Sequence, residues 1–181
     1  IFMRTLFFIL LSFYTMAQTE TQSYEVLKNI AGCEIRFYPP VMMAKYSSDN
    51  GGSGFGKLFK YISGNNDGET KISMTTPVHM EKSESENSMA FVLPKSFNKE
   101  NAPKPNDASL VVYESDSRHY AAIEYSGYTD EVKEKENTDK LKKILNEQNI
   151  EIVGDSKILV YNSPYKIVFR RNEILIPISY N

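Results

Sequence analysis

The order of the expected elements constrains this chain most, because it repeats once along the sequence. Alternating apolar residues bounded by turn signals predict, in each half, two strands, one helix and two further strands. The expected strands lie at 24–38, 41–47, 71–80 and 88–94, and then at 109–115, 119–126, 157–164 and 172–179. The expected helices lie at 54–64 and 138–149. Short strands around one helix per half predict an α+β domain with a largely antiparallel sheet.

The length and charge of the chain narrow its function. Its 181 residues suit one compact domain with a proper core. The net charge of −2 provides no large positive field for a phosphate backbone, so we expect no nucleic-acid partner. The segment 95–107, rich in Pro, Asn and Lys, is expected to join the two halves. A groove between two such halves is a common place for a small ligand.

The N-terminal segment has the pattern of a secretory signal peptide. Arg4 precedes the apolar run LFFILLSFY, and the small residues Thr15 and Ala17 follow it. The run is too short to span a bilayer, which requires roughly 20 apolar residues. We therefore predict a signal peptide at 1–17 and a single mature domain at 18–181. The protein is expected to be exported, periplasmic or secreted, with no stable membrane span after cleavage.

The first expected helix carries an apolar stripe that has two interpretations. Phe55, Leu58, Phe59 and Ile62 follow one another at helical spacing. Such a stripe usually packs on the protein's own sheet, which predicts a core helix. Glycines crowd the entrance at 51–56, however, and they allow another molecule to approach the backbone closely. A role in recognition therefore stays open.

The segment KISMTTPVHM at 71–80 is predicted to be a strand with one core face. Ile72, Met74 and Val78 are expected to face the core beneath the first helix. Pro77 cannot donate to a ladder, so we expect it to mark an edge or a bulge where pairing stops. His79 falls on the more polar side, and we expect it to lie at the surface. The segment is thus interpreted as structural.

The sequence carries no recognised catalytic or metal motif. GGSGFG has Phe55 where a nucleophile elbow requires Gly, and Lys57 lacks the Ser or Thr that follows the lysine of a phosphate loop. His79 and His119 do not have zinc-ligand spacing, and Cys33 alternates with apolar residues as a small buried side chain would. We therefore expect that the protein is not an enzyme.

Six segments match a known family in order and separation. They are YEVL, EIRFYPPVMMA, GFGKLFKYISGNN, KISMTTPV, YNSP and RRNEI. Over about residues 23–178, the chain resembles the SOUL heme-binding family. The resemblance implies a distorted, mainly antiparallel β-barrel of two pseudo-symmetric halves with one helix each, similar to gyrase-inhibitor-like effector-binding domains. It also implies non-catalytic binding of heme or a related tetrapyrrole in a shallow apolar groove beside the first helix, as a carrier or buffer.

Matched residue by residue, the resemblance implies a site made from the first helix and a later loop. The helix would contribute Phe55, Phe59 and Lys60, and the loop after YNSP would contribute Tyr165 and Lys166. A porphyrin has broad apolar faces and two carboxylates at one edge, so it requires an aromatic wall with cations nearby. This set of residues offers both.

The resemblance supplies no iron ligand. Where a His is proposed as a ligand in the family, it lies before the first helix, and this chain has no His before His79. We therefore expect tetrapyrrole binding without a fixed bond to iron from His79, His119 or Cys33. Two other functions stay open: a small-molecule effector-binding or hydrolase domain of the gyrase-inhibitor-like type, and a protein-interaction module.

The N-terminal pattern yields the first testable prediction. Mature protein purified from its native host should begin at or near Gln18, because signal peptidase cleaves after a small residue such as Ala17. N-terminal sequencing of the exported fraction checks this expectation. An intact N-terminus on protein from the cytosolic fraction would contradict it.

Overall fold

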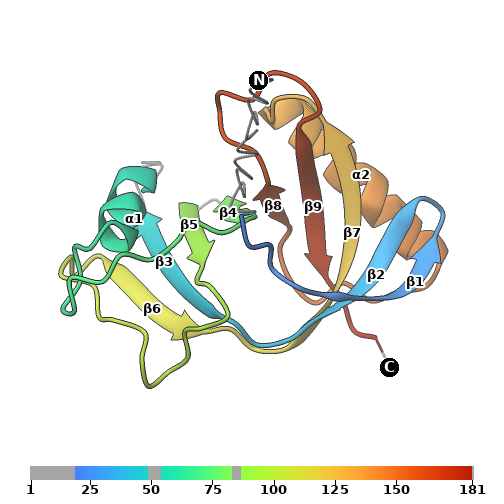
Figure 1. The fold of residues 1–181 in the computed structure, drawn as a ribbon. Coiled ribbons are helices and arrows are strands. Elements are labelled where there is room, and N and C mark those ends of the chain that lie inside the picture. The colour runs from blue at the N-terminus through green and yellow to red at the C-terminus, as the bar shows by residue number, and fades with distance from the viewer. Residues whose placement is uncertain (1–18, 49–53, 83–86, 181) are drawn as a thin grey trace, which may run out of the picture.

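The computed structural model describes residues 19–48, 54–82 and 87–180, which form one nine-stranded sheet with two helices (Figure 1). The first-half elements are β1 (Glu25–Ile30), β2 (Cys33–Tyr38), β3 (Met42–Ser48), α1 (Phe55–Ile62), β4 (Val78–Lys82) and β5 (Asn87–Val92). The second-half elements are β6 (Leu110–Glu114), β7 (Arg118–Ser126), α2 (Glu131–Glu147), β8 (Lys157–Val160) and β9 (Arg171–Pro177). The expected signal peptide at 1–17 lies outside the described residues.

The strand order confirms the predicted α+β class with a mainly antiparallel sheet. The order is β1-β2-β7-β9-β8-β4-β5-β3-β6, and each neighbouring pair is antiparallel. Without β1, the order has an internal twofold symmetry. Each first-half strand occupies the position, counted from one end, that its second-half counterpart occupies from the other end; the counterparts are β2 and β6, β3 and β7, β4 and β8, and β5 and β9. This symmetry matches the repeat in the sequence. The sheet bends into two lobes (Figure 1), and β1 and β6 stay separate ends, so the described strands do not close completely.

Both helices pack on the same face of the sheet, one over each lobe. Leu58 and Tyr61 of α1 are buried in a core with residues of β3 and β5. Leu141 and Leu145 of α2 are buried in a second core with residues of β7 and β9. Met80 of β4 packs against both cores. We call this side of the sheet the helix face and the opposite side the helix-free face. None of the described helices is long and apolar enough to cross a membrane.

Local chemistry sets where each helix begins. Gly54 precedes α1 with a φ of 62°, and a Cβ at this position would lie 2.2 Å from Cδ1 of Tyr46, so only glycine fits. Asp130 caps α2 by accepting a hydrogen bond from the backbone N–H of Lys133. This cap starts α2 at Glu131 rather than at the predicted residue 138. The earlier turns were missed because their mostly charged residues face solvent and form no apolar stripe.

Two predictions about buried residues are confirmed. Ile72, Met74 and Val78 pack in the core beneath α1. Cys33 is buried in the core beneath α2 as a free thiol. Burial raises the pKa of this thiol, so Cys33 behaves as a small apolar side chain rather than as a nucleophile.

Only the end of the segment 71–80 is a strand. Its ladders with β5 and β8 begin at Val78, and β4 lies between these two strands, so the expectation that Pro77 marks a sheet edge is wrong. Pro77 is tolerated because it precedes the first ladder pair, where its missing N–H is not needed. Thr75 bonds the neighbouring strand through its side chain instead, with Oγ1 donating to the carbonyl of Val92 at 2.5 Å.

On the helix-free face, a buried carboxylate links distant parts of the chain. Glu173 of β9 is fully buried, and its two oxygens accept hydrogen bonds from Nη1 and Nη2 of Arg36 on β2 at 2.8 and 3.0 Å. Arg171 and the Tyr161 hydroxyl donate to the same carboxylate at 2.6 and 2.8 Å. Burial alone would raise the pKa of Glu173, but these donors, Arg36 foremost, hold it below its usual range. Ala122 lies on this face of the intervening β7 and leaves room for the contact.

The substitution Glu173→Gln tests this network. It removes the fully buried counter-ion of Arg36 and leaves only the partly exposed Glu34, which accepts from Nε at 2.7 Å, so the free energy of unfolding should fall by about 3 kcal/mol. Urea unfolding at pH 7 measures the change. Glu124→Gln is the matched control, because the Glu124 side chain is 57% exposed, and loss of its exposed pair with Arg171 should cost less than about 1 kcal/mol.

The double variant Arg36→Met with Glu173→Leu distinguishes two causes of the lost stability: loss of the ion pair itself, and burial of a charge whose partner has been removed. It should recover much of the stability lost in Glu173→Gln, because the two partners are removed together. An equally large loss in the double variant would contradict this account.

Candidate functional site

The outer side of α1 carries a pair of exposed aromatic rings. Phe55 and Phe59 are 42% and 50% exposed, and their rings stack with centroids 6.0 Å apart and planes 12° apart. Phe91 of β5 meets the Phe55 ring edge-on at 5.4 Å, which ties the pair to the core. The residues of the predicted apolar stripe therefore differ in burial. Leu58 and Ile62 face the sheet, while the two Phe rings remain partly exposed to solvent.

Lys60 follows Phe59 on the same helix and offers an uncommitted cation. Its side chain is exposed and makes no ion pair with a described residue. Lys57 differs, because its Nζ donates to Ser109 Oγ at 2.7 Å and lies 3.6 Å from Asp107 Oδ2. The Lys60 ammonium therefore has no counter-ion among the described residues.

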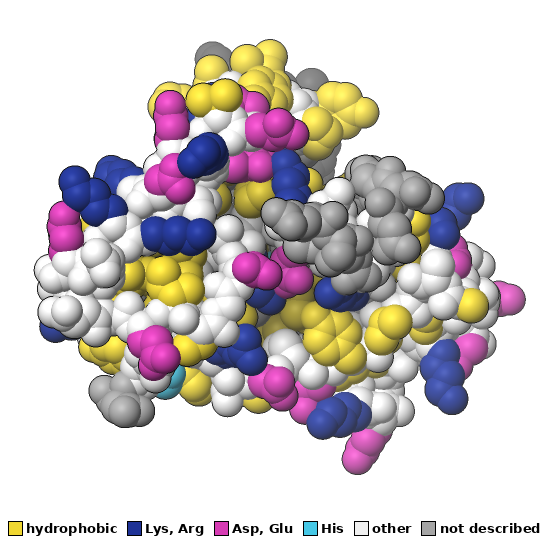
Figure 2. Space-filling model, turned by 180° about the vertical axis from the view of Figure 1, so that it is seen from behind, with side chains coloured by type: hydrophobic (Ala, Val, Ile, Leu, Met, Phe, Trp, Pro, Cys, Tyr) yellow, Lys and Arg dark blue, Asp and Glu magenta, His cyan; other side chains and the backbone are white. Residues whose placement is uncertain are grey.

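The loop between β8 and β9 contributes the other two predicted site residues. Tyr165 is 90% exposed, and Lys166 beside it is also exposed. The next three residues, Ile167, Val168 and Phe169, are 77%, 62% and 90% exposed. Figure 2 shows apolar side chains gathered at the top of the molecule, where Figure 1 places this loop. The sequence-based prediction missed these three, although an apolar run between two strands was the available signal.

Arg170 forms hydrogen bonds that anchor the backbone of this loop. Its side chain is buried, and Nη1 donates to the carbonyls of Ser163 and Lys166 at 2.7 and 2.8 Å. The guanidinium also lies over the ring of Tyr128, 4.3 Å from its centroid. These contacts tie the loop backbone to the second half, so the exposed side chains stand on an anchored base.

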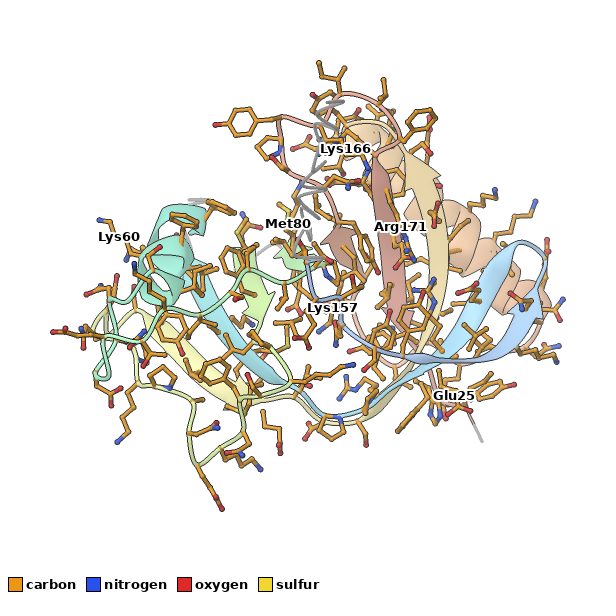
Figure 3. The ribbon with its side chains drawn as sticks, viewed as in Figure 1. Glu25, Lys60, Met80, Lys157, Lys166 and Arg171 are labelled. Atoms are coloured by element: carbon orange, nitrogen blue, oxygen red, sulfur yellow. The ribbon has the colours of Figure 1, made fainter. Side chains whose placement is uncertain are left out.

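The two groups of predicted residues stand on opposite halves. Figure 3 shows Lys60 on α1 and Lys166 on the β8–β9 loop, with Met80 of β4 between them in that view. The described hydrogen bonds, ion pairs and ring contacts do not join the two groups. The structure thus brings the three α1 residues together and the two loop residues together, and it leaves the groups apart.

No His or Cys of the described chain lies beside α1. His79 is on the helix-free face, because its neighbour on β4, Met80, packs against both cores on the helix face and side chains alternate along a strand. His119 contacts the ring of Phe37 at 5.3 Å in the other lobe, and Cys33 is buried beneath α2. The described residues contain no group of three or more His, Cys, Asp or Glu suited to a metal ion. The described His and Cys side chains therefore lie away from the exposed rings of α1.

A separate cavity of about 170 Å³ lies on the helix-free face. His79 lines it and is only 8% exposed, with Nε2 2.7 Å from Oε1 of Gln22. The expectation of a surface His is therefore wrong, because Gln22 from the segment before β1 covers the ring. Burial, and then the nearby Lys157 ammonium, lowers the pKa of His79 to about 3, so the ring is neutral at pH 7.

The buried His79 predicts sensitivity to mild acid. The unfolded chain gains a proton on this ring below its ordinary pKa of 6.5, whereas the folded protein gains it only near pH 3. The stability that the neutral ring provides is complete above pH 6.5 and is lost as the pH falls towards 3. Between pH 7 and pH 5 the free energy of unfolding should fall by about 2 kcal/mol more in the parent than in His79→Gln.

Urea unfolding of both proteins at the two pH values measures this difference. Lys157, Glu81 and Glu173 are the charged groups near the ring, and they remain in the variant, so their own titration cancels. Equal acid sensitivity of the parent and His79→Gln would contradict the prediction.

Comparison with known proteins agrees with this fold. A family model described as SOUL heme-binding protein matches residues 19–177. Heme-binding protein 2 of Homo sapiens is 30% identical over 157 residues, which cover 78% of this chain and 75% of that protein. The C-terminal domain of EcmrR has a TM-score of 0.59 at 12% identity, covering 87% and 99% of the two chains. A hydrolase from Listeria innocua has a TM-score of 0.56 at 11% identity, covering 84% and 94%. The two solved structures share the fold, and the family match shows that this chain belongs to the SOUL heme-binding protein family.

Proposed function

We propose that this protein binds heme or a related tetrapyrrole without catalysis, in a shallow groove beside α1, and serves as an exported carrier or buffer of that ligand. The observation that carries the proposal is the exposed, stacked pair of Phe55 and Phe59 next to the unpaired Lys60. Membership of the SOUL family supports the class of ligand. The human relative carries the name heme-binding protein 2.

The residues beside α1 fit the chemistry of a porphyrin. Two exposed phenyl rings offer apolar area that a porphyrin face covers, which removes both surfaces from water. Lys60 on α1 and Lys166 on the β8–β9 loop would supply cations for the two propionates. Tyr165 adds a second aromatic surface on the loop. In this proposal the ligand bridges the two groups of residues.

Heme would bring its own iron chemistry, and the side chains of this site contribute recognition of the ring. Phe59 contacts a face of the macrocycle, Lys60 holds a propionate, and Tyr165 and Lys166 close the site from the loop. Because no His or Cys of the described residues lies beside α1, the proposal requires no bond to iron. Iron-free porphyrin should then bind about as well as hemin.

A small-molecule effector-binding or hydrolase role is the second candidate. The cavity on the helix-free face favours it, since a pocket with several polar side chains is a usual place for a small ligand. One neighbour in fold is called a hydrolase, but at 11% identity the likeness shows the fold alone. Hydrolysis of candidate esters by the purified protein would favour this role over simple binding.

Substitutions on α1 test the proposed groove. Phe59→Ala should weaken porphyrin binding by about 1 to 3 kcal/mol through lost apolar and stacking contact. Lys60→Ala should cost less than about 1 kcal/mol, because an exposed ion pair is weak. Fluorescence or absorbance titration with hemin and with protoporphyrin measures both. Val111→Ala on β6 and Lys142→Ala on α2 are matched controls, because exposed Val111 alternates with Leu110 and Val112, which face α1, and exposed Lys142 lies on the helix of the other lobe.

The His79→Gln variant checks the role of iron in the same titrations. It should leave the affinities for hemin and protoporphyrin unchanged, because His79 lies on the face opposite α1. A large loss of hemin affinity in His79→Gln, together with a low-spin heme spectrum in the parent, would show that iron ligation dominates. Normal binding by Phe59→Ala would place the ligand elsewhere.

A further inference from the structure

The cavity on the helix-free face is a second candidate site, independent of the proposed tetrapyrrole groove. It lies where the two halves meet, since its walls come from both. Its volume of about 170 Å³ is below the roughly 300 to 1,000 Å³ of pockets for drug-sized ligands, so it suits a smaller molecule. The lining residues are Gln22, Tyr38, Met43, His79, Tyr113, Ser115, Asp116, Arg118, Tyr120 and Lys157.

Hydrogen-bond donors dominate the polar lining. The Tyr38 hydroxyl accepts from Nη1 of Arg36 at 3.1 Å, and Ser115 Oγ accepts from the backbone N–H of Val41 at 3.1 Å, so each keeps its own proton to donate. The Tyr120 hydroxyl has no hydrogen-bond partner among the described residues. Three O–H donors therefore line one small space.

A buried amide adds further donors. Oε1 of Gln22 is engaged by His79 at 2.7 Å, which directs the amide nitrogen to other partners. That nitrogen has no acceptor among the described side chains, and Gln22 is 8% exposed. An acceptor in the cavity could pair with this amide, since its nitrogen carries two N–H donors.

Cations outnumber carboxylates around the cavity. Nζ of Lys157 lies 2.6 Å from Glu81 Oε1, and Nζ of Lys45 lies 3.7 Å from the other oxygen, so two ammonium groups share one carboxylate. Arg118 at the rim makes no ion pair with a described residue, and Asp116 is the carboxylate among the lining residues. Among the lining residues two cations, Lys157 and Arg118, stand against the one carboxylate of Asp116, and together with the hydroxyl donors they favour an anion.

We propose that this cavity binds a small oxyanion, a carboxylate or phosphate group, between the hydroxyls of Tyr38, Ser115 and Tyr120 and the ammonium of Lys157. Such a group supplies acceptors to these hydroxyls, and its negative charge faces the Lys157 ammonium. Because the cavity and the α1 groove lie on opposite faces of the sheet, the two ligands bind separately.

Calorimetric titration of the purified protein with phosphate and with succinate tests the proposal, and the neutral diamide succinamide is the matched ligand control. Saturable binding of at least one anion, with no binding of succinamide, is expected. Lys157→Met should weaken anion binding about tenfold through loss of a charge-assisted contact, while Lys157→Arg should retain most of it. Tyr120→Phe keeps the ring but removes the hydroxyl, and it should weaken binding about three- to tenfold.

Tyr165→Phe is the matched protein control, because it also removes one tyrosine hydroxyl but lies on the β8–β9 loop, outside the cavity. Anion binding by this variant should equal that of the parent. Hemin binding by Lys157→Met and Tyr120→Phe should equal that of the parent, so failure of one site is distinguishable from failure of the other.

Circular dichroism identifies any variant that does not fold, and Tyr120→Phe remains informative if Lys157→Met is one of them. The proposal is overturned if neither anion binds, if succinamide binds equally well, or if Tyr120→Phe binds as the parent does.

Discussion

The buried ion pair between Arg36 and Glu173 is the interaction on which the arrangement of the sheet depends. It joins β2 to β9 across β7, and 137 positions of sequence separate its two residues. Because side chains alternate along a strand, a slip of β9 by one residue would turn Glu173 into the apolar core beneath α2 and leave Arg36 with only the partly exposed Glu34 as counter-ion. The ion pair thus selects one register, while the apolar residues beneath the helices supply most of the stabilisation.

The same alternation separates the two candidate sites. Residues facing the helices form two apolar cores joined at Met80, and α1 leaves Phe55 and Phe59 partly uncovered at the border of one of them. Residues facing the other way bring His79 and Lys157 together with phenols around a polar cavity. A flat apolar ring and a small oxyanion require opposite environments, so one bent sheet can serve both.

Much of the fold was predictable from local patterns. The repeated order of elements predicted the α+β class, and the alternation at 71–80 predicted which residues lie beneath α1. The place of β4 in the middle of the sheet was not predictable from Pro77, because strand order depends on pairing with β5 and β8, which are distant in sequence. His79 was expected at the surface for a similar reason, since the residue that covers it, Gln22, comes from before β1.

The sequence by itself determined the family, the two-half plan and the side chains proposed for the tetrapyrrole, because these depend on residue identity and on spacing within single elements. Only the tertiary structure decided that Phe55 and Phe59 stay exposed while Leu58 and Tyr61 are buried, because the sheet covers only one side of α1. It also decided that no described hydrogen bond, ion pair or ring contact joins the α1 residues to the loop residues, and that Tyr38, Tyr120 and Lys157 share one cavity. Those relations arise from contacts between distant segments, and no local pattern encodes such contacts.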